Sequence, residues 1–73
     1  LAAEAEVDKT SEEGDTPLLV ASQNGHVEVV KVLLAAEAEV DKADNVGATP
    51  LYCALRHNHT EVVALLRAAG ATE

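Results

Sequence analysis

The sequence repeats itself at a fixed interval of 33 residues. A shift by that interval places residues 1–9 on residues 34–42, with nine identities in a row, and the whole overlap gives 22 identities in 40 comparable positions. A fixed period of this length is typical of repeat architectures, in which each repeat is a supersecondary unit that buries its apolar side against a neighbour. The repeat therefore constrains the fold before any local feature is considered.

Composition limits the core that such units can build. The chain has 73 residues, one Tyr and no Phe, Trp or Met, so the core must consist of Leu, Val and Ala. A single core of this size rarely supplies more than about 3–5 kcal/mol, which favours thin, closely packed layers. No run approaches the roughly 18 consecutive apolar residues of a membrane span, so we expect no membrane partner.

The charge of the chain argues against nucleic-acid binding. The formal net charge is -8, and the five Lys and Arg residues are scattered rather than clustered. Affinity for DNA or RNA depends on clustered cations that neutralise phosphates. An acidic surface serves the solubility of a small protein or favours a basic partner, and both interpretations stay open. The single cysteine, Cys53, excludes an internal disulfide and favours an intracellular location.

A Thr-Pro pair at the same place in both units predicts the start of a helix. The threonine hydroxyl can accept a hydrogen bond from an early backbone N–H, and proline loses no hydrogen bond at the first helical position. We expect two short helices, residues 17–23 and 50–57. Gly25 and Asn58 should end them in the left-handed conformation.

A longer helix should follow each stop, over residues 27–36 and 60–69. Isolated helices of this length are marginal in water, so each must pack on its own short helix and on the adjacent unit. A wide apolar stripe provides for that packing. In the first unit the stripe is formed by Val29, Val30, Leu33 and Leu34.

The pattern G-x-TPL-x-x-A followed by GH-x-EVV-x-x-L-L resembles the ankyrin repeat. The resemblance covers the tail of a preceding repeat, residues 1–9, and two full repeats, residues 10–42 and 43–73. It implies one all-α solenoid segment of stacked antiparallel helix pairs with projecting hairpin-like loops. It also implies a non-catalytic module that binds a partner protein through the loop tips and the concave face of the short helices.

Several positions depart from the family pattern. Leu19 and Tyr52 replace the histidine of the TPLH motif, so the hydrogen bond that this histidine makes to the motif threonine is lost at Leu19. Glu37 stands where glycine ends the long helix of the family. We therefore expect the helix over residues 27–36 to run longer.

The two ends of the segment differ in polarity. Arg67 replaces the apolar Leu34 and faces the place where a next repeat would stack, so residues 43–73 are expected to cap the array. The first full repeat has no such polar edge, and two repeats fall short of the three usually needed for stability. We expect its apolar edge to be covered by upstream repeats of a longer chain or by another chain, which includes self-association.

The strongest candidate for chemistry is a cluster of Cys53, His57 and His59. Such residues could hold zinc or act as a nucleophile and base. However, His59 recurs as His26, which has no Cys or His neighbours, and Cys53 stands where the other repeat has Val20. Structural roles are the favoured interpretation. We expect no metal, no cofactor and no catalytic residues.

Positions that differ between the two repeats are the candidate partner contacts. Loops carry both variability and function, although unconstrained surface positions also drift. Tyr52 is included because aromatic rings are favoured at binding hot spots, with packing between the short helices as its other interpretation. The candidates are Glu12, Glu13, Asp15, Gln23, Asn24, Asn45, Val46, Ala48, Tyr52, Arg56 and His57. The alternative function is an architectural or designed repeat segment that has no partner of its own.

Overall fold

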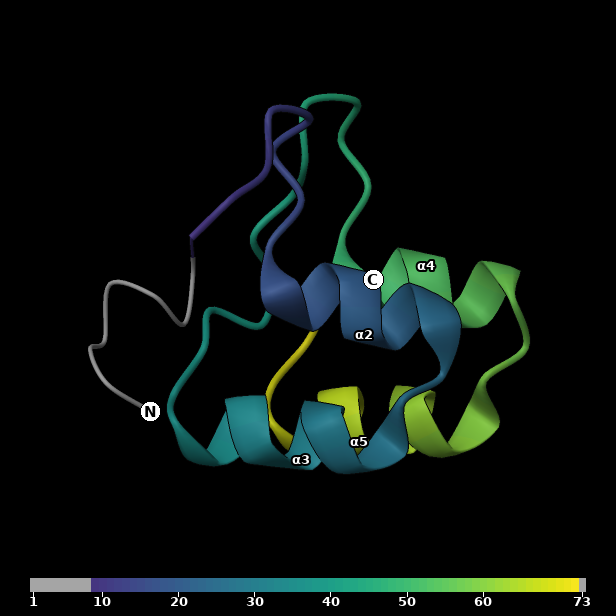
Figure 1. Cartoon of the computed structure of the whole chain (residues 1–73). Coiled ribbons are helices and arrows are strands. Elements are labelled where there is room, and N and C mark those ends of the chain that lie inside the picture. The colour runs from purple at the N-terminus through teal and green to yellow at the C-terminus, as the bar shows by residue number, and fades with distance from the viewer. Residues whose placement is uncertain (1–8, 73) are drawn as a thin grey trace.

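The chain folds into two stacked helix pairs (Figure 1). The computed structural model describes residues 9–72, so the predicted repeat tail, residues 1–9, lies outside the described residues except for Lys9. The described range forms the helices α2 (Pro17–Asn24), α3 (Val27–Ala35), α4 (Pro50–Arg56) and α5 (Thr60–Ala68) and contains no strand. The predicted all-α architecture is confirmed.

The four helices form two layers. The short helices α2 and α4 lie side by side, the long helices α3 and α5 form the second layer, and the loops before α2 and α4 project away from both layers (Figure 1). None of these helices combines the length and the apolar character that a membrane crossing requires. Because these loops project beside α2 and α4, their tips lie next to the ends of the short helices, and a surface can form between the tips and the helices.

The Thr-Pro pairs cap the short helices as predicted. Thr16 Oγ1 accepts a hydrogen bond from the Leu19 N–H at 3.1 Å, and Thr49 Oγ1 accepts one from the Tyr52 N–H at 3.1 Å. The donor in each case is the backbone of the residue that replaces the TPLH histidine. The cap therefore forms without a histidine side chain.

The left-handed helix stops are confirmed at Gly25, with φ of 72°, and at Asn58, with φ of 61°. The expectation that the first long helix runs past residue 36 is wrong, because α3 ends at Ala35. Glu37 takes the left-handed conformation itself, with φ of 66°. For a residue with a Cβ this conformation costs roughly 1–2 kcal/mol.

Burial of the next residue explains why Glu37 accepts that conformation. Ala38 is buried in the core, and its N–H donates to the Leu33 carbonyl oxygen at 3.1 Å. A longer helix would carry Ala38 away from the core. Tertiary packing thus overrides the local preference for glycine at position 37.

The core lies between the two helix layers and consists of the aliphatic side chains of Leu, Val and Ala. One residue of the predicted stripe departs from it, because Val29 is 47% exposed, whereas Val62 at the equivalent position is 1% exposed. The first repeat stacks on Val62, and no described segment stacks on Val29 in the same way. The core residues are Leu18, Ala21, Val30, Leu33, Ala38, Leu51, Ala54, Val62, Val63 and Leu66.

A histidine joins the two repeats at the turn after α2. His59 Nε2 lies 3.0 Å from the Gln23 carbonyl oxygen, so the ring and the end of α2 share a hydrogen bond. The ring covers Gly25 closely, since a Cβ at Gly25 would lie 2.7 Å from His59 Nδ1. Real Cβ atoms do not approach a ring so closely. The contact therefore requires glycine at position 25.

Replacement of Gly25 by alanine should test this contact. Both Gly25→Ala and Gly47→Ala place a Cβ at positive φ, but only the first places it against another residue, because nothing lies within 4 Å of a Cβ at Gly47. We expect Gly25→Ala to lower the free energy of unfolding by about 1 kcal/mol more than Gly47→Ala, as overpacking adds to the shared backbone strain. Urea denaturation measures both losses, and equal losses would contradict the contact.

Candidate partner-binding groove

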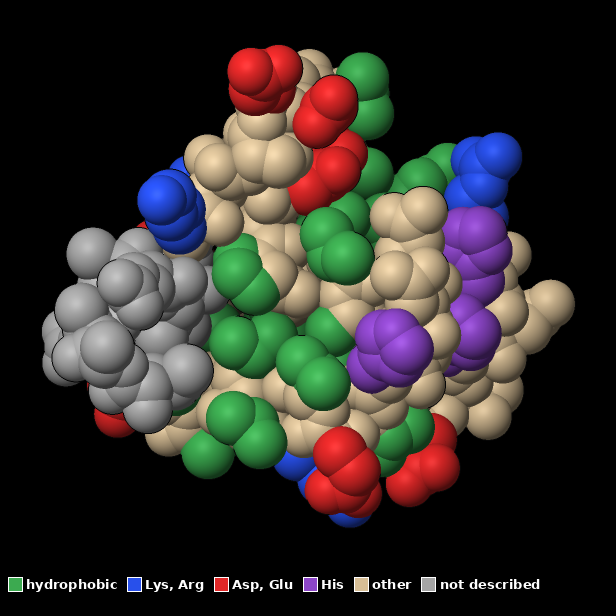
Figure 2. Space-filling view, viewed as in Figure 1, with side chains coloured by type: hydrophobic (Ala, Val, Ile, Leu, Met, Phe, Trp, Pro, Cys, Tyr) green, Lys and Arg blue, Asp and Glu red, His purple; other side chains and the backbone are tan. Residues whose placement is uncertain are grey.

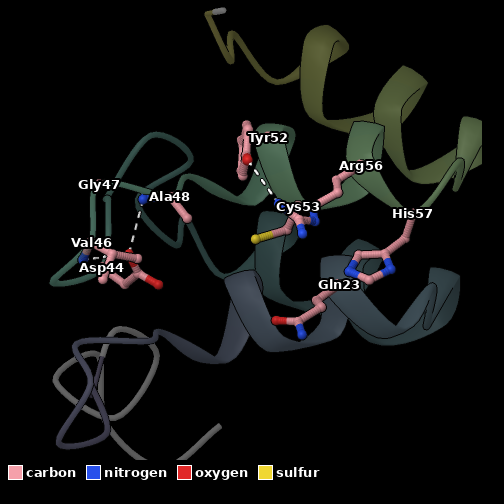
Figure 3. Close-up of a pocket in the computed structure, with 9 residues that line it drawn as sticks. All are labelled: Gln23, Asp44, Val46, Gly47, Ala48, Tyr52, Cys53, Arg56 and His57. Carbon is pink, nitrogen blue, oxygen red and sulfur yellow. Dashed lines mark hydrogen bonds between the residues drawn. The ribbon is translucent and has the colours of Figure 1, made fainter.

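A groove of about 640 Å³ lies between the second loop tip and the short helices (Figure 3). The loop tip forms one side, α4 forms the other, and Gln23 of α2 extends the lining toward the first repeat. We call this surface the groove. Its lining residues are Gln23, Asp44, Val46, Gly47, Ala48, Tyr52, Cys53, Arg56 and His57.

Asp44 holds the second tip in shape. Its Oδ1 atom accepts hydrogen bonds from the Val46 N–H at 3.0 Å and from the Ala48 N–H at 2.9 Å. These backbone hydrogen bonds hold the pKa of Asp44 below its ordinary value, and the bond from Ala48 has the largest effect. The fixed tip leaves the Val46 side chain 87% exposed at the groove.

Asn45 links the second tip to the first. Its backbone N–H donates to the Glu13 carbonyl oxygen at 2.9 Å, and its side-chain Nδ2 donates to the Glu12 carbonyl oxygen at 3.0 Å. These two hydrogen bonds hold the first tip against the second, and the two loops form one surface. Asn45 has a structural role in that surface, which the comparison of the two repeats does not reveal.

The joined tips bring Asp15 close to Asp44. A hydrogen bond between the two carboxyl groups raises the pKa of Asp15, and partial burial and the negative charges of Asp44 and Glu13 act in the same direction. Asp15 Oδ1 is buried and has no hydrogen-bond partner among the described residues. Ionised Asp15 is therefore in an unfavourable environment.

Tyr52 presents its ring on the outer face of α4. The side chain is 51% exposed, so its interpretation as a residue packed between the short helices is wrong. One turn later Arg56 donates a hydrogen bond from Nη1 to Tyr52 Oη at 3.1 Å (Figure 3). This bond orients both side chains, which reduces the ordering that a bound partner would require.

Cys53 and His57 lie at the groove, but the thiol is not activated. Burial raises the pKa of Cys53, and the negative charges of Asp44 and Asp15 add to that rise. A nucleophilic cysteine needs the opposite shift. The His57 ring instead stacks on His59, with centroids 6.0 Å apart. Within residues 9–72 no group of three or more His, Cys, Asp or Glu side chains could hold a metal ion.

The groove gathers many of the predicted contact residues. Gln23, Val46, Ala48, Tyr52, Arg56 and His57 line it. Glu12, Glu13 and Asn24 are exposed outside it, and Asp15 is half-buried beneath the tips. The lining also includes Asp44, Gly47 and Cys53, which we did not predict. A comparison of repeats cannot find Gly47, because both repeats have glycine there, whereas Asp44 and Cys53 do differ from Ser11 and Val20.

Comparison with known proteins agrees with the architecture. A family model described as ankyrin repeats (3 copies) matches residues 1–72. No curated protein matches the chain. The match covers both helix pairs and the loops that form the groove.

Replacement of Asp15 by asparagine should stabilise the chain near neutral pH. The pKa of Asp15 in the folded state is raised from 3.8, so the folded state holds this proton more tightly than the unfolded state does. Stability is therefore lost as the pH rises through the folded-state pKa. We expect Asp15→Asn to melt at a higher temperature than the parent at about pH 7, and the difference to shrink as the pH falls below the unfolded value.

The matched control is Glu12→Gln, which removes an exposed carboxylate from the same tip. Both variants remove one negative charge. The control therefore measures the gain in stability that comes only from lower overall charge repulsion. Thermal unfolding followed by circular dichroism measures both variants. Equal gains for the two variants, or a gain for Asp15→Asn that does not depend on pH, would contradict the pairing with Asp44.

Proposed function

The chain belongs to the ankyrin repeat family, and from that premise we propose that it binds a partner protein through the groove. Ankyrin repeats are generally protein–protein interaction modules, and the family is typically non-catalytic. The observation that carries the proposal is the pair of exposed side chains, Val46 and Tyr52, on the two sides of a groove whose backbone is fixed.

Preorganisation supports a role in recognition. Asp44 fixes the loop tip, Thr49 caps α4, and the Arg56 hydrogen bond orients the Tyr52 ring. A partner would therefore meet groups that already have their bound positions. Association loses less free energy to the ordering of side chains and loops when the surface is preformed. A modest groove on a small chain can then be specific.

We infer that the partner segment is basic with one apolar side chain. The formal net charge is -8, and the tips contribute Glu12, Glu13 and Asp44 next to the groove. Complementary charge steers association and selects the partner. The exposed Val46 and the Tyr52 ring would receive an apolar side chain between them, because aromatic residues are favoured as hot spots.

Alanine replacement in the groove tests the proposal. The groove variant combines Val46→Ala, Tyr52→Ala, Arg56→Ala and His57→Ala. Its affinity for a captured partner should fall at least about tenfold, because truncation of a few hot-spot residues removes most of the binding energy. The melting temperature should change little, since all four side chains are exposed. Asn45 is left intact because its replacement would separate the tips.

The control changes Glu28 and Lys31 to alanine, since this exposed ion pair on α3 lies outside the groove. Surface ion pairs of this kind contribute little to stability. Affinity measured by surface plasmon resonance at rising salt concentration tests the charge of the partner. A basic partner should bind more weakly as the salt concentration rises, because salt screens its attraction to the acidic chain. Equal affinity of the groove variant and the control variant would refute the assignment of the surface.

A further inference from the structure

The groove carries opposite charges on its two sides. Acidic side chains gather on the loop tips, and a basic side chain lies apart from them beside histidine side chains (Figure 2). Asp44 belongs to the tip side of the groove, and Arg56 and His57 belong to the α4 side (Figure 3). The formal net charge of the chain is -8, so the cation on the α4 side is a local exception to the charge of the whole molecule.

Arg56 is held in place but is not neutralised by this chain. Its Nη1 donates to Tyr52 Oη at 3.1 Å, and no carboxylate of residues 9–72 forms an ion pair with it. Lys31 on α3 differs, because its Nζ lies 3.6 Å from Glu28 Oε2. A guanidinium has five N–H donors in a planar fork, so the bond to Tyr52 leaves most of them for a ligand. A carboxylate matches that fork with two parallel hydrogen bonds.

Direct contact decides which charge each side of the groove attracts. Salt screens exposed charges that lie more than about 8 Å apart at physiological ionic strength, whereas partly buried pairs are screened much less. A partner side chain that covers Arg56 therefore meets a positive charge, although the chain as a whole is acidic. A cation of the partner at the same point would be repelled, and such like-charge contacts select against wrong partners.

The end of α4 favours a side-chain carboxylate over the carboxylate of a chain terminus. Chain termini are captured by backbone N–H groups that converge on one point. Here the His57 N–H donates to the Cys53 carbonyl oxygen at 3.2 Å. The Asn58 N–H likewise donates to the Leu55 carbonyl oxygen at 3.1 Å. Both N–H groups are used within the turn that ends α4, so an Asp or Glu side chain within a longer segment fits this place better.

We propose that the partner segment carries an Asp or Glu side chain that binds Arg56, and that its apolar residue separates this acidic residue from the basic residue at the tips. The inference rests on the proposed function of the groove and adds the order of charges along the partner. The basic side chain lies near Asp44, and the apolar side chain contacts Val46 and Tyr52. A uniformly basic segment binds less well, because it places a cation against Arg56.

Selection from a phage-displayed library of random peptides tests this order of charges, with the parent chain and Arg56→Glu as separate baits. Peptides enriched on the parent should carry an acidic and a basic residue on opposite sides of an apolar residue. Peptides enriched on Arg56→Glu should lose the acidic residue. The matched control bait is Lys31→Glu, which changes the net charge equally outside the groove and should select the same pattern as the parent.

Titration of one enriched peptide, followed by fluorescence anisotropy, measures the size of the effect. Replacement of its acidic residue by lysine should weaken binding to the parent at least about fivefold, because an attraction becomes a repulsion. Arg56→Glu should prefer the lysine form, and Lys31→Glu should keep the preference of the parent. Circular dichroism checks that each bait is folded. If Arg56→Glu does not fold, Arg56→Gln takes its place and should bind the two forms equally.

Two kinds of failure are distinguishable. Equal affinity of the parent for the two peptide forms, or an unchanged preference in Arg56→Glu, would overturn the order of charges. The groove would remain the binding surface in that case if Val46→Ala with Tyr52→Ala still weakened binding. Enriched peptides that bind this double variant as tightly as the parent, or no enrichment on the parent, would refute the groove as the binding surface and the order of charges with it.

Discussion

The contact between the two helix pairs is the interaction on which the rest of the structure depends. Each pair is built from Leu, Val and Ala, and helices of seven to nine residues are marginal in water on their own. Val62 is buried because the first repeat covers it, whereas the equivalent Val29, which no described segment covers in this way, is exposed. The contact of His59 with Gln23 and Gly25 fixes how the two helix pairs align.

That alignment also builds the groove. Docking of α4 on α2 places the second tip beside the first, where Asn45 can bond to Glu12 and Glu13. The same docking brings Gln23 to the lining that α4 and the tip provide. It also forces Asp15 toward Asp44, which raises the pKa of Asp15. The groove and the raised pKa of Asp15 therefore have one origin.

Local chemistry in the sequence predicts the helices well, because the Thr-Pro caps and the turns at Gly25 and Asn58 act within a few residues. Glu37 is the exception, since the burial of Ala38 decides its conformation and burial is not a local property. The candidate site is only partly predictable for the same reason. Divergence between repeats finds Arg56 and His57, but the bond from Asn45 to Glu12 depends on two loops that meet only after the repeats have stacked.

If stacking sustains the whole segment, the two repeats must unfold as one cooperative unit. Native-state hydrogen exchange at low denaturant concentrations measures this directly, because Leu33 in α3 and Leu66 in α5 are buried at equivalent positions. Their amides should converge on the same opening free energy as denaturant is added. An amide in one repeat that opens at a clearly lower free energy, with the other repeat still protected, would show that each helix pair holds its own structure and would contradict the account.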